Sequence, residues 1–195
     1  MFKLIIVDPN KELCDALAIQ FEEENDVTVV NGKFEELEEF DCMVSAANSF
    51  GLMDGGVDMA ITNFFGVQLM DRVQAHIIKH FRGEQSVGTS FIIETNNPKH
   101  PYLAHTPTMR VPMRIFNTDY VYKAFFACLL STWNFNQTSK NKINILACPG
   151  LGTSCGAVDP IEAGRQMGLA YRNFSNPPEM ISWPYALNRQ KAIGR

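Results

Sequence analysis

The sequence predicts an α/β fold with three layers, in which helices cover both faces of a mixed sheet. Short apolar runs rich in Val and Ile alternate along the chain with longer segments whose apolar residues recur at helical spacing. No internal repeat or low-complexity block interrupts this alternation. Alternation of this kind is typical of a sheet that has helices packed on each side.

The expected strands are short β-branched or apolar runs, several of them bounded by residues that favour turns. They lie at 3–7, 27–30, 42–46, 89–94, 102–106 and 142–148. Asp8-Pro9-Asn10 breaks the first strand, and Asn96-Asn97-Pro98 forms a turn between the fourth and fifth, which are expected to pair. The run from Cys42 to Ala47 is apolar enough for a strand that is covered on both faces.

The expected helices lie at 11–24, 57–65, 67–81, 118–133 and 160–174. The second and third are separated near Gly66, and Pro160 stands in the first turn of the last one, which is a favourable place for proline. The acidic segment 32–40 is expected to be a loop with one helical turn. The tail, residues 176–195, contains Pro177-Pro178, has no clear period and is expected to be irregular.

Length and composition indicate an ordinary globular protein. A chain of 195 residues fits a single domain over 1–195 that can bury a sizeable core. The net charge of −4 argues against a large nucleic-acid surface. No apolar run approaches the roughly 18 residues of a membrane span, and the apolar start is too short for a signal peptide. We therefore expect a cytoplasmic monomer with no membrane partner.

The cysteines and histidines do not predict a metal or a cofactor. The five cysteines include no C-x-x-C pair, so reduced thiols are expected. His76 and His80 have the spacing of a metal pair on a helix, but the adjacent glutamate of metalloproteases is absent and a solvated helix face is favoured. A receiver-type signalling domain is excluded, because no phosphoacceptor aspartate stands at the end of the strand that leads to Asn48.

A first candidate site follows the strand at 42–46. Asn48 stands where this strand ends, and Gly55-Gly56 removes side chains where the next helix begins. Backbone N–H groups at a helix N-terminus can approach an anion closely there, and the helix dipole favours negative charge. Asp58 falls in the first turn of the same helix. An amide, a glycine pair and a carboxylate within eleven positions therefore predict a phosphorylated sugar as ligand.

A second loop follows the strand at 142–148 and is rich in glycine. Its residues Gly150–Gly156 offer several backbone N–H donors and the hydroxyl groups of Thr153 and Ser154. Ligands of α/β sheets bind outside the carboxyl ends of the strands. Both loops are therefore expected to line one crevice.

These two loops resemble the ligand loops of the macro domain family, the ADP-ribose-binding and Appr-1''-p processing family, of which the chain looks like a divergent member. The family's first loop reads Asn-Ala-Ala-Asn, a linker, then Gly-Gly-Gly-Val-Asp-x-Ala-Ile. The matching stretches here are Ser45-Ala-Ala-Asn48 and Gly55-Gly56-Val57-Asp58-Met-Ala-Ile61. The family's second loop is similar to Ile145-Leu-Ala-Cys-Pro149-Gly-Leu-Gly-Thr153-Ser-Cys-Gly156.

The resemblance implies ADP-ribose or a derivative as ligand, and it implies roles for the matching residues. The expected ligand-binding residues are Ala47, Gly55, Gly56, Val57, Pro149, Gly152, Thr153, Ser154, Cys155 and Gly156. Asn48 is expected to bond a ribose hydroxyl and help position a water, and Asp58 to orient or deprotonate that water. The alternatives are a turn former for Asn48 and a dipole-stabilising acid for Asp58.

Two functions are compatible with this resemblance. One is a hydrolase of ADP-ribosyl groups on protein or nucleic acid, of ADP-ribose phosphate, or of acetylated ADP-ribose. The other is a non-catalytic module that reads or sequesters ADP-ribose or a related NAD-derived nucleotide. The same loops serve either purpose.

The chain departs from the family pattern at three places. Asp54 stands where the family has a neutral residue, and a carboxylate there repels a diphosphate unless it points away. The family's adenine-binding aspartate is missing from 30–34, where Asn31 is the candidate replacement. In the tail, Trp183 and Tyr185 are expected either to pack onto the sheet or to fold over the ligand as a stacking lid.

Overall fold

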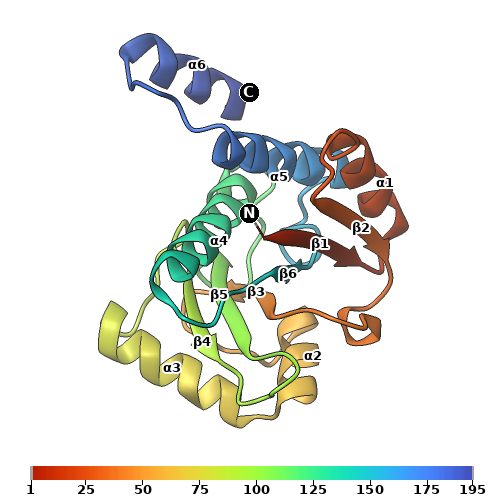
Figure 1. Cartoon of the computed structure of the whole chain (residues 1–195), viewed down its shortest axis with the longest axis vertical. Helices are drawn as coiled ribbons and strands as arrows, with labels where there is room; N and C mark the ends of the chain where they lie inside the picture. The colour runs from red at the N-terminus through yellow and green to blue at the C-terminus, as the bar shows by residue number, and fades with distance from the viewer. Residues whose placement is uncertain (1, 195) are drawn as a thin grey trace.

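The computed structural model describes residues 2–194, and their fold is built on one six-stranded sheet (Figure 1). The strand order is β2-β1-β6-β3-β5-β4. The strands are β1 (Lys3–Asp8), β2 (Val27–Asn31), β3 (Cys42–Asn48), β4 (Phe91–Glu94), β5 (Tyr102–Met109) and β6 (Ile145–Cys148). Adjacent strands are parallel except for β4, which runs antiparallel to β5 at one edge. The predicted mixed sheet and the predicted β4–β5 pairing are therefore confirmed.

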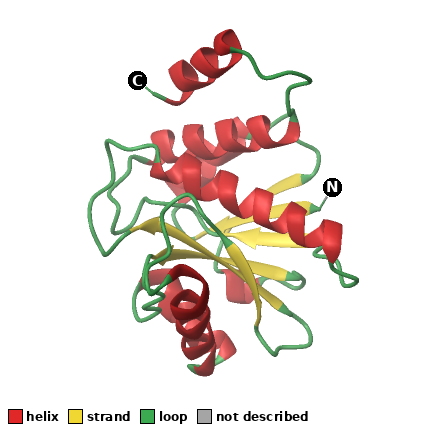
Figure 2. Ribbon diagram, turned by 90° about the vertical axis from the view of Figure 1, so that its left-hand side faces the viewer, coloured by secondary structure: helices red, strands yellow, loops and turns green. Residues whose placement is uncertain are grey.

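Helices cover both faces of this sheet (Figures 1 and 2). They are α1 (Lys11–Gln20), the short 3-10 turn η1 (Phe34–Glu36), α2 (Gly56–Phe65), α3 (Gln68–Phe81), α4 (Tyr120–Thr138), α5 (Pro160–Ser175) and α6 (Trp183–Ile193). The α1, α4 and α5 helices lie on one face, while α2 and α3 lie on the other. This arrangement is the predicted three-layer α/β/α fold.

The alternation of side chains along the strands explains why two cores form. Leu4 and Ile6 of β1 join the core beneath α1, α4 and α5, whereas Val7 joins the core beneath α2 and α3. In β3, Val44 and Met43 are divided between the two cores in the same way. Successive side chains of a strand point to opposite faces, so a sheet that is covered twice needs apolar residues at nearly every position.

The tail differs from the sequence prediction. Residues 183–193 form the helix α6, so the expectation of an irregular segment over 176–195 is wrong for this part. Ser182 caps the helix by accepting a hydrogen bond from the backbone N–H of Tyr185, and a proline occupies the first turn. The α6 helix lies outside the layer of α1, α4 and α5 (Figure 2).

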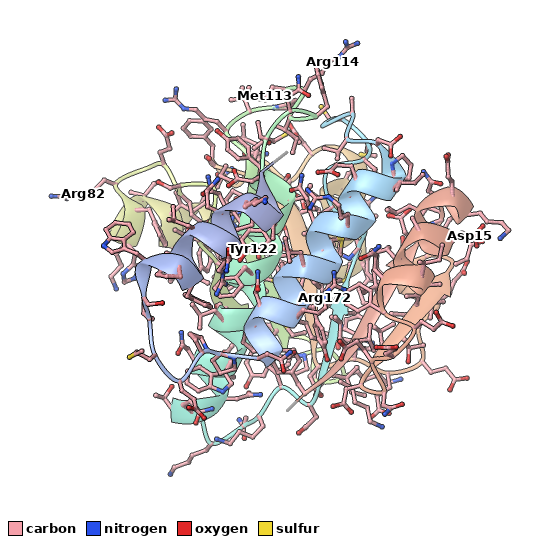
Figure 3. The ribbon with its side chains drawn as sticks, turned by 90° about the horizontal axis from the view of Figure 1, so that it is seen from above. Asp15, Arg82, Met113, Arg114, Tyr122 and Arg172 are labelled. Carbon is pink, nitrogen blue, oxygen red and sulfur yellow. The ribbon has the colours of Figure 1, made fainter. Side chains whose placement is uncertain are left out.

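Two arginines attach α6 to the helices beneath it. Arg189 donates to the hydroxyl of Tyr122 on α4 at 2.9 Å, and Figure 3 shows Tyr122 close to α6. Arg165 of α5 donates to the carbonyl of Ala192 at 2.9 Å. No residue of α6, all of which the structure describes, is buried. Over residues 2–194, no helix is both long enough and apolar enough to cross a membrane.

Candidate functional site

A cleft of about 790 Å³ opens at the carboxyl ends of β1, β6 and β3, three neighbouring strands of the sheet. Both predicted loops line it. The predicted site residues in its wall are Ala47, Asn48, Gly55, Gly56, Val57, Asp58, Pro149, Gly152, Thr153, Ser154, Cys155 and Gly156. Parallel strands that end side by side bring their following loops together, which is why segments about a hundred residues apart in the chain share one wall.

The first loop ends at an open helix N-terminus. The first backbone N–H of α2 to bond within the helix is that of Met59, which donates to the carbonyl of Gly55 at 3.2 Å. The N–H groups of Gly56, Val57 and Asp58 have no hydrogen-bond acceptor among the described residues. Asn10 and Asp159 cap the N-termini of α1 and α5 with their side chains, whereas Gly55 has no side chain that could cap α2.

The glycine pair keeps this helix end accessible. A Cβ atom on Gly55 or on Gly56 would meet no described atom within 4 Å. Gly56 also has a φ of +55°, a conformation that residues with a Cβ rarely adopt. The α2 N-terminus therefore presents unpaired donors and the positive end of the helix dipole to the cleft.

The second loop is held in place through its carbonyl groups. The carbonyl of Gly152 accepts from Val158 at 3.0 Å, and that of Gly156 accepts from Ile115 at 2.8 Å. The N–H groups of Thr153, Ser154, Cys155 and Gly156 find no acceptor within residues 2–194. Bonds through carbonyls fix the loop and leave its donors free, as a site for an anion requires.

Asp58 lines the cleft and is buried, with 5% of its surface exposed. Its Oδ1 atom accepts a hydrogen bond of 2.6 Å from the hydroxyl of Ser45, which is fully buried. Burial raises the pKa of Asp58 from 3.8 to about 7, while the Ser45 hydrogen bond lowers it and the charge of Asp54 raises it.

The two carboxylate oxygens of Asp58 differ in their surroundings. The Oδ2 atom has no hydrogen-bond partner among the described residues. It is nevertheless not one of the described polar atoms that are both unpaired and fully buried, so part of its surface is exposed. Asp58 itself lines the cleft. A carboxyl group with one open oxygen and a pKa near neutrality can accept a proton from a water in the cleft.

Comparison with known proteins identifies the family. The sequence matches the macro domain family over residues 44–167, which include both loops. The chain belongs to the macro domain family. An uncharacterized protein of Aquifex aeolicus (strain VF5) is 30% identical over 149 residues, a match that covers 76% of this chain and 82% of the relative.

Solved structures agree with this assignment at the level of the fold. The macrodomain of Mycobacterium tuberculosis DarG superposes with a TM-score of 0.60 at 17% identity, covering 73% of this chain and 87% of that one. A glycine-to-valine variant of the Oceanobacillus iheyensis macrodomain, solved with ADPR (ADP-ribose), gives a TM-score of 0.61 at 19% identity. That match covers 83% of this chain and 88% of the Oceanobacillus chain.

In this macro domain, the side chain of Asn48 is bonded within its own loop. Its Oδ1 atom accepts from the backbone N–H groups of Phe50 at 3.0 Å and Leu52 at 3.3 Å. Its Nδ2 atom donates to the carbonyl of Leu52 at 2.7 Å. These bonds correspond to the turn-forming alternative, although Asn48 also lines the cleft.

Asn31 is placed differently from the other predicted site residues of the macro domain. It is not among the described residues that line the cleft. Its side-chain amide donates instead to the carbonyl of Asp8 at 3.0 Å and to the sulfur of Cys14 at 3.8 Å. The position of Asn31 therefore does not support a contact with the base.

Asp8 lines the cleft and was not predicted from the sequence. Its two carboxylate oxygens accept from the backbone N–H groups of Asn10 at 2.8 Å and Gly150 at 3.1 Å, so it links the loops after β1 and β6. Lys33 and Phe34 lie in the same wall. The sequence showed Asp8 only as part of a strand-breaking turn. The detectable signal was an acid at the carboxyl end of a strand.

The remaining candidates of the macro domain lie elsewhere. The ring of His76 stacks on Phe91 at 4.0 Å, and the part of the chain that the structure describes holds no cluster of three or more metal-ligating side chains. Trp183 and Tyr185 are not part of the cleft wall at any described position. Trp183 is 80% exposed, so neither the lid nor packing onto the sheet describes it.

Proposed function

We propose that this macro domain binds ADP-ribose or a derivative in the cleft, with the diphosphate on the unpaired N–H groups of both loops. One observation carries the proposal: two separate sets of free backbone donors, at Gly56–Asp58 and at Thr153–Gly156, line one cleft. The ADP-ribose bound to the Oceanobacillus neighbour supports the same class of ligand.

The proposed attraction for the ligand is local. The net charge is −4, so the field of the whole protein does not favour an anion. The dipole of α2 and the oriented amides of the second loop supply partial positive charge at short range instead. Asp54 is exposed in the same wall and opposes this effect unless its carboxylate turns toward solvent.

We propose further that the macro domain hydrolyses its ligand at the terminal ribose. Asp58 would accept a proton through Oδ2 from a water that attacks where the terminal ribose joins its substituent. The bond between the ribose and the substituent would break, and the substituent would leave with the proton from Asp58, while the ordered loop around Asn48 would hold the ribose. Orientation can contribute about 7–11 kcal/mol to the lowering of a barrier, which suits a cleft wall that contains no histidine among the described residues. The proposed substrates are ADP-ribosyl groups on protein or nucleic acid, ADP-ribose phosphate and acetylated ADP-ribose.

A second candidate function is a reader without catalysis. The bonding of Asn48 favours it, because the oxygen and one N–H of this amide are used within the loop. The residue assigned to position water then has less capacity to do so. Binding through the two loops would be unaffected.

Thermal unfolding with added ADP-ribose tests the class of ligand. Binding at a hundredfold excess over the Kd adds about 2.7 kcal/mol to the free energy of unfolding. For a chain of this size we expect the Tm to rise by several degrees, at about 2–4 °C per kcal/mol. The absence of a shift at millimolar ADP-ribose would exclude both candidate functions.

Turnover of ADP-ribosylated protein separates the hydrolase from the reader. In the hydrolase, Asp58→Asn should abolish turnover while the Kd for ADP-ribose changes little, because the main-chain donors remain. No turnover by the wild type, together with micromolar binding, would assign the reader function. Unchanged turnover in Asp58→Asn would remove Asp58 from the mechanism.

A further inference from the structure

We propose that Ser45 is a positioning residue for Asp58: its hydroxyl holds one carboxylate oxygen and so directs the other toward the ligand. The inference rests on the proposed function, in which the free oxygen acts on a water beside the bound ligand. Ser45 touches no part of the cleft itself, since it is not among the described residues of the wall. Its effect must therefore pass through Asp58.

The contact between the two side chains is short and enclosed. The Ser45 Oγ and Asp58 Oδ1 atoms are 2.6 Å apart, in the range of hydrogen bonds from a hydroxyl to an ionised oxygen. A serine hydroxyl has one proton, so donation to Asp58 fixes its orientation. Ser45 is fully buried and Asp58 nearly so, and solvent therefore does not compete for this bond.

The backbone on both sides of this contact is rigid. Ser45 lies within β3, where its register partner on β5 is His105. Asp58 lies in the first turn of α2. A bond between a central strand and a helix fixes the carboxyl group more closely than a loop residue could. The resemblance to the family places an asparagine at position 45, so the serine is a feature of this chain.

The charged surroundings of Asp58 oppose the effect of Ser45. Among the described residues, Asp54 on the preceding loop is the charged side chain that acts on Asp58, and it favours the protonated form. Burial acts in the same direction. The Ser45 hydroxyl on β3 favours the ionised form, and the open N-terminus of α2 contributes in the same sense. Ser45 and Asp54 should thus shift the ionisation of Asp58 in opposite directions.

A carbon-13 NMR titration of the Asp58 carboxyl tests this directly. In Ser45→Ala, we expect the midpoint to move to higher pH by about one unit, because the ionised form loses its hydrogen bond. In Asp54→Asn, we expect a movement to lower pH by roughly a few tenths of a unit, because an exposed charge is screened. Added salt should reduce the second effect and leave the first.

Matched variants separate positioning from a general loss of structure. Ser90→Ala also removes a hydroxyl pair, because Ser90 Oγ lies 2.8 Å from Thr106 Oγ1, and it should leave the midpoint unchanged. Ser45→Thr, which keeps the hydroxyl, should restore the wild-type midpoint. If Ser45→Ala does not fold, Ser45→Cys has a similar volume and a weak donor, and it should shift the midpoint upward by a smaller amount.

The outcomes distinguish the two proposals. A hydrolase should show the same upward shift in the pH profile of kcat for Ser45→Ala. A midpoint that stays unchanged in both Ser45→Ala and Ser45→Cys would overturn the role of Ser45. If the midpoint shifts as expected in a protein that binds no ADP-ribose, the proposed function fails while the action of Ser45 on Asp58 stands.

Discussion

The glycines that line the cleft are needed in the first loop and in the second loop for opposite reasons. In the first loop, a Cβ atom on Gly55 or Gly56 would project into open space. In the second, a Cβ atom on Gly150 would lie 2.1 Å from Leu13, and one on Gly156 would lie 2.4 Å from the carbonyl oxygen of Gly152. Gly55 and Gly56 thus leave open space next to the backbone, whereas Gly150 and Gly156 allow other parts of the protein to pack closely against the backbone.

This difference shows that a glycine-rich sequence does not by itself indicate where a ligand lies. Gly55 and Gly56 leave space at a helix end. Gly150 and Gly156 of the second loop permit a tight fold in which the N–H groups of 153–156 have no acceptor among the described residues. Substitutions of these glycines should therefore have different effects in the two loops. In the first loop they should lower the affinity for the ligand, and in the second they should lower the stability of the protein.

The largest effect should come from filling the open space of the first loop. Gly55 has an extended φ of −145°, so Gly55→Glu introduces no backbone strain. The side chain would occupy the proposed diphosphate position and repel the anion. We expect the Kd for ADP-ribose, measured by calorimetry, to rise at least about a thousandfold, or about 4 kcal/mol, with little change in Tm.

Gly83→Glu is the control for the added charge, because a Cβ atom on Gly83 also meets no described atom within 4 Å, and Gly83 is not among the described residues of the cleft wall. Gly83 has a φ of +97°, so this variant, unlike Gly55→Glu, should lose some stability. It should leave the Kd unchanged. Retained affinity in Gly55→Glu would contradict the placement of the diphosphate.

The next effect concerns Asp58, a buried carboxyl group whose ionisation costs stability. Its pKa is about 7 in the folded protein and 3.8 ordinarily, so the folded state binds its proton more tightly. Its contribution to stability is then greatest below about pH 4 and is lost as the pH rises to about 7. Asparagine does not titrate, so Asp58→Asn should gain stability relative to wild type over that interval, by at most about 4 kcal/mol.

Urea unfolding of both proteins at several values between pH 4 and pH 8 measures this difference, because all other titrating groups cancel. A difference that does not change with pH would mean that Asp58 is ionised in the folded protein throughout this interval.

The smallest of these effects should come from the packed glycines. Gly156→Ala forces the new methyl group against the carbonyl of Gly152 and the side chain of Ile115, which are 2.4 Å and 2.8 Å from its position. We expect the free energy of unfolding to fall by about 1–3 kcal/mol, as for other overpacked sites. Circular dichroism melting measures this, and a variant as stable as wild type would mean that the second loop is adaptable.

Most of the fold could be predicted because burial imposes a period on the sequence. The strands and the helices α1–α5 pack against the sheet, and their apolar spacing records this. The α6 helix has no buried residue and hence no such spacing. It depends on the cap at Ser182 and on the contacts of Arg189. The contacts of Arg189 become evident only when the tail is placed beside α4.

The candidate site could be predicted from the sequence where its binding groups belong to the backbone. The glycines and strand ends of both loops identify it, since main-chain donors depend on local conformation. Contacts between distant side chains could not be predicted in the same way. Ser45 was noted only as part of a motif, Asp8 as part of a turn, and Asn31 as a contact to the base, because each depends on what lies beside it in space.

The place of β6 in the sheet has a consequence for biosynthesis. It lies between β1 and β3, and it pairs with residues such as Lys3 that were synthesised more than a hundred residues earlier. Until β6 leaves the ribosome, the nascent chain can form only two separate parts of the sheet, the pair β2-β1 and the triplet β3-β5-β4. The second loop follows β6 directly, so the strand that joins these halves is followed at once by the last segment of the cleft wall. A chain truncated before β6 should therefore neither fold fully nor bind the nucleotide.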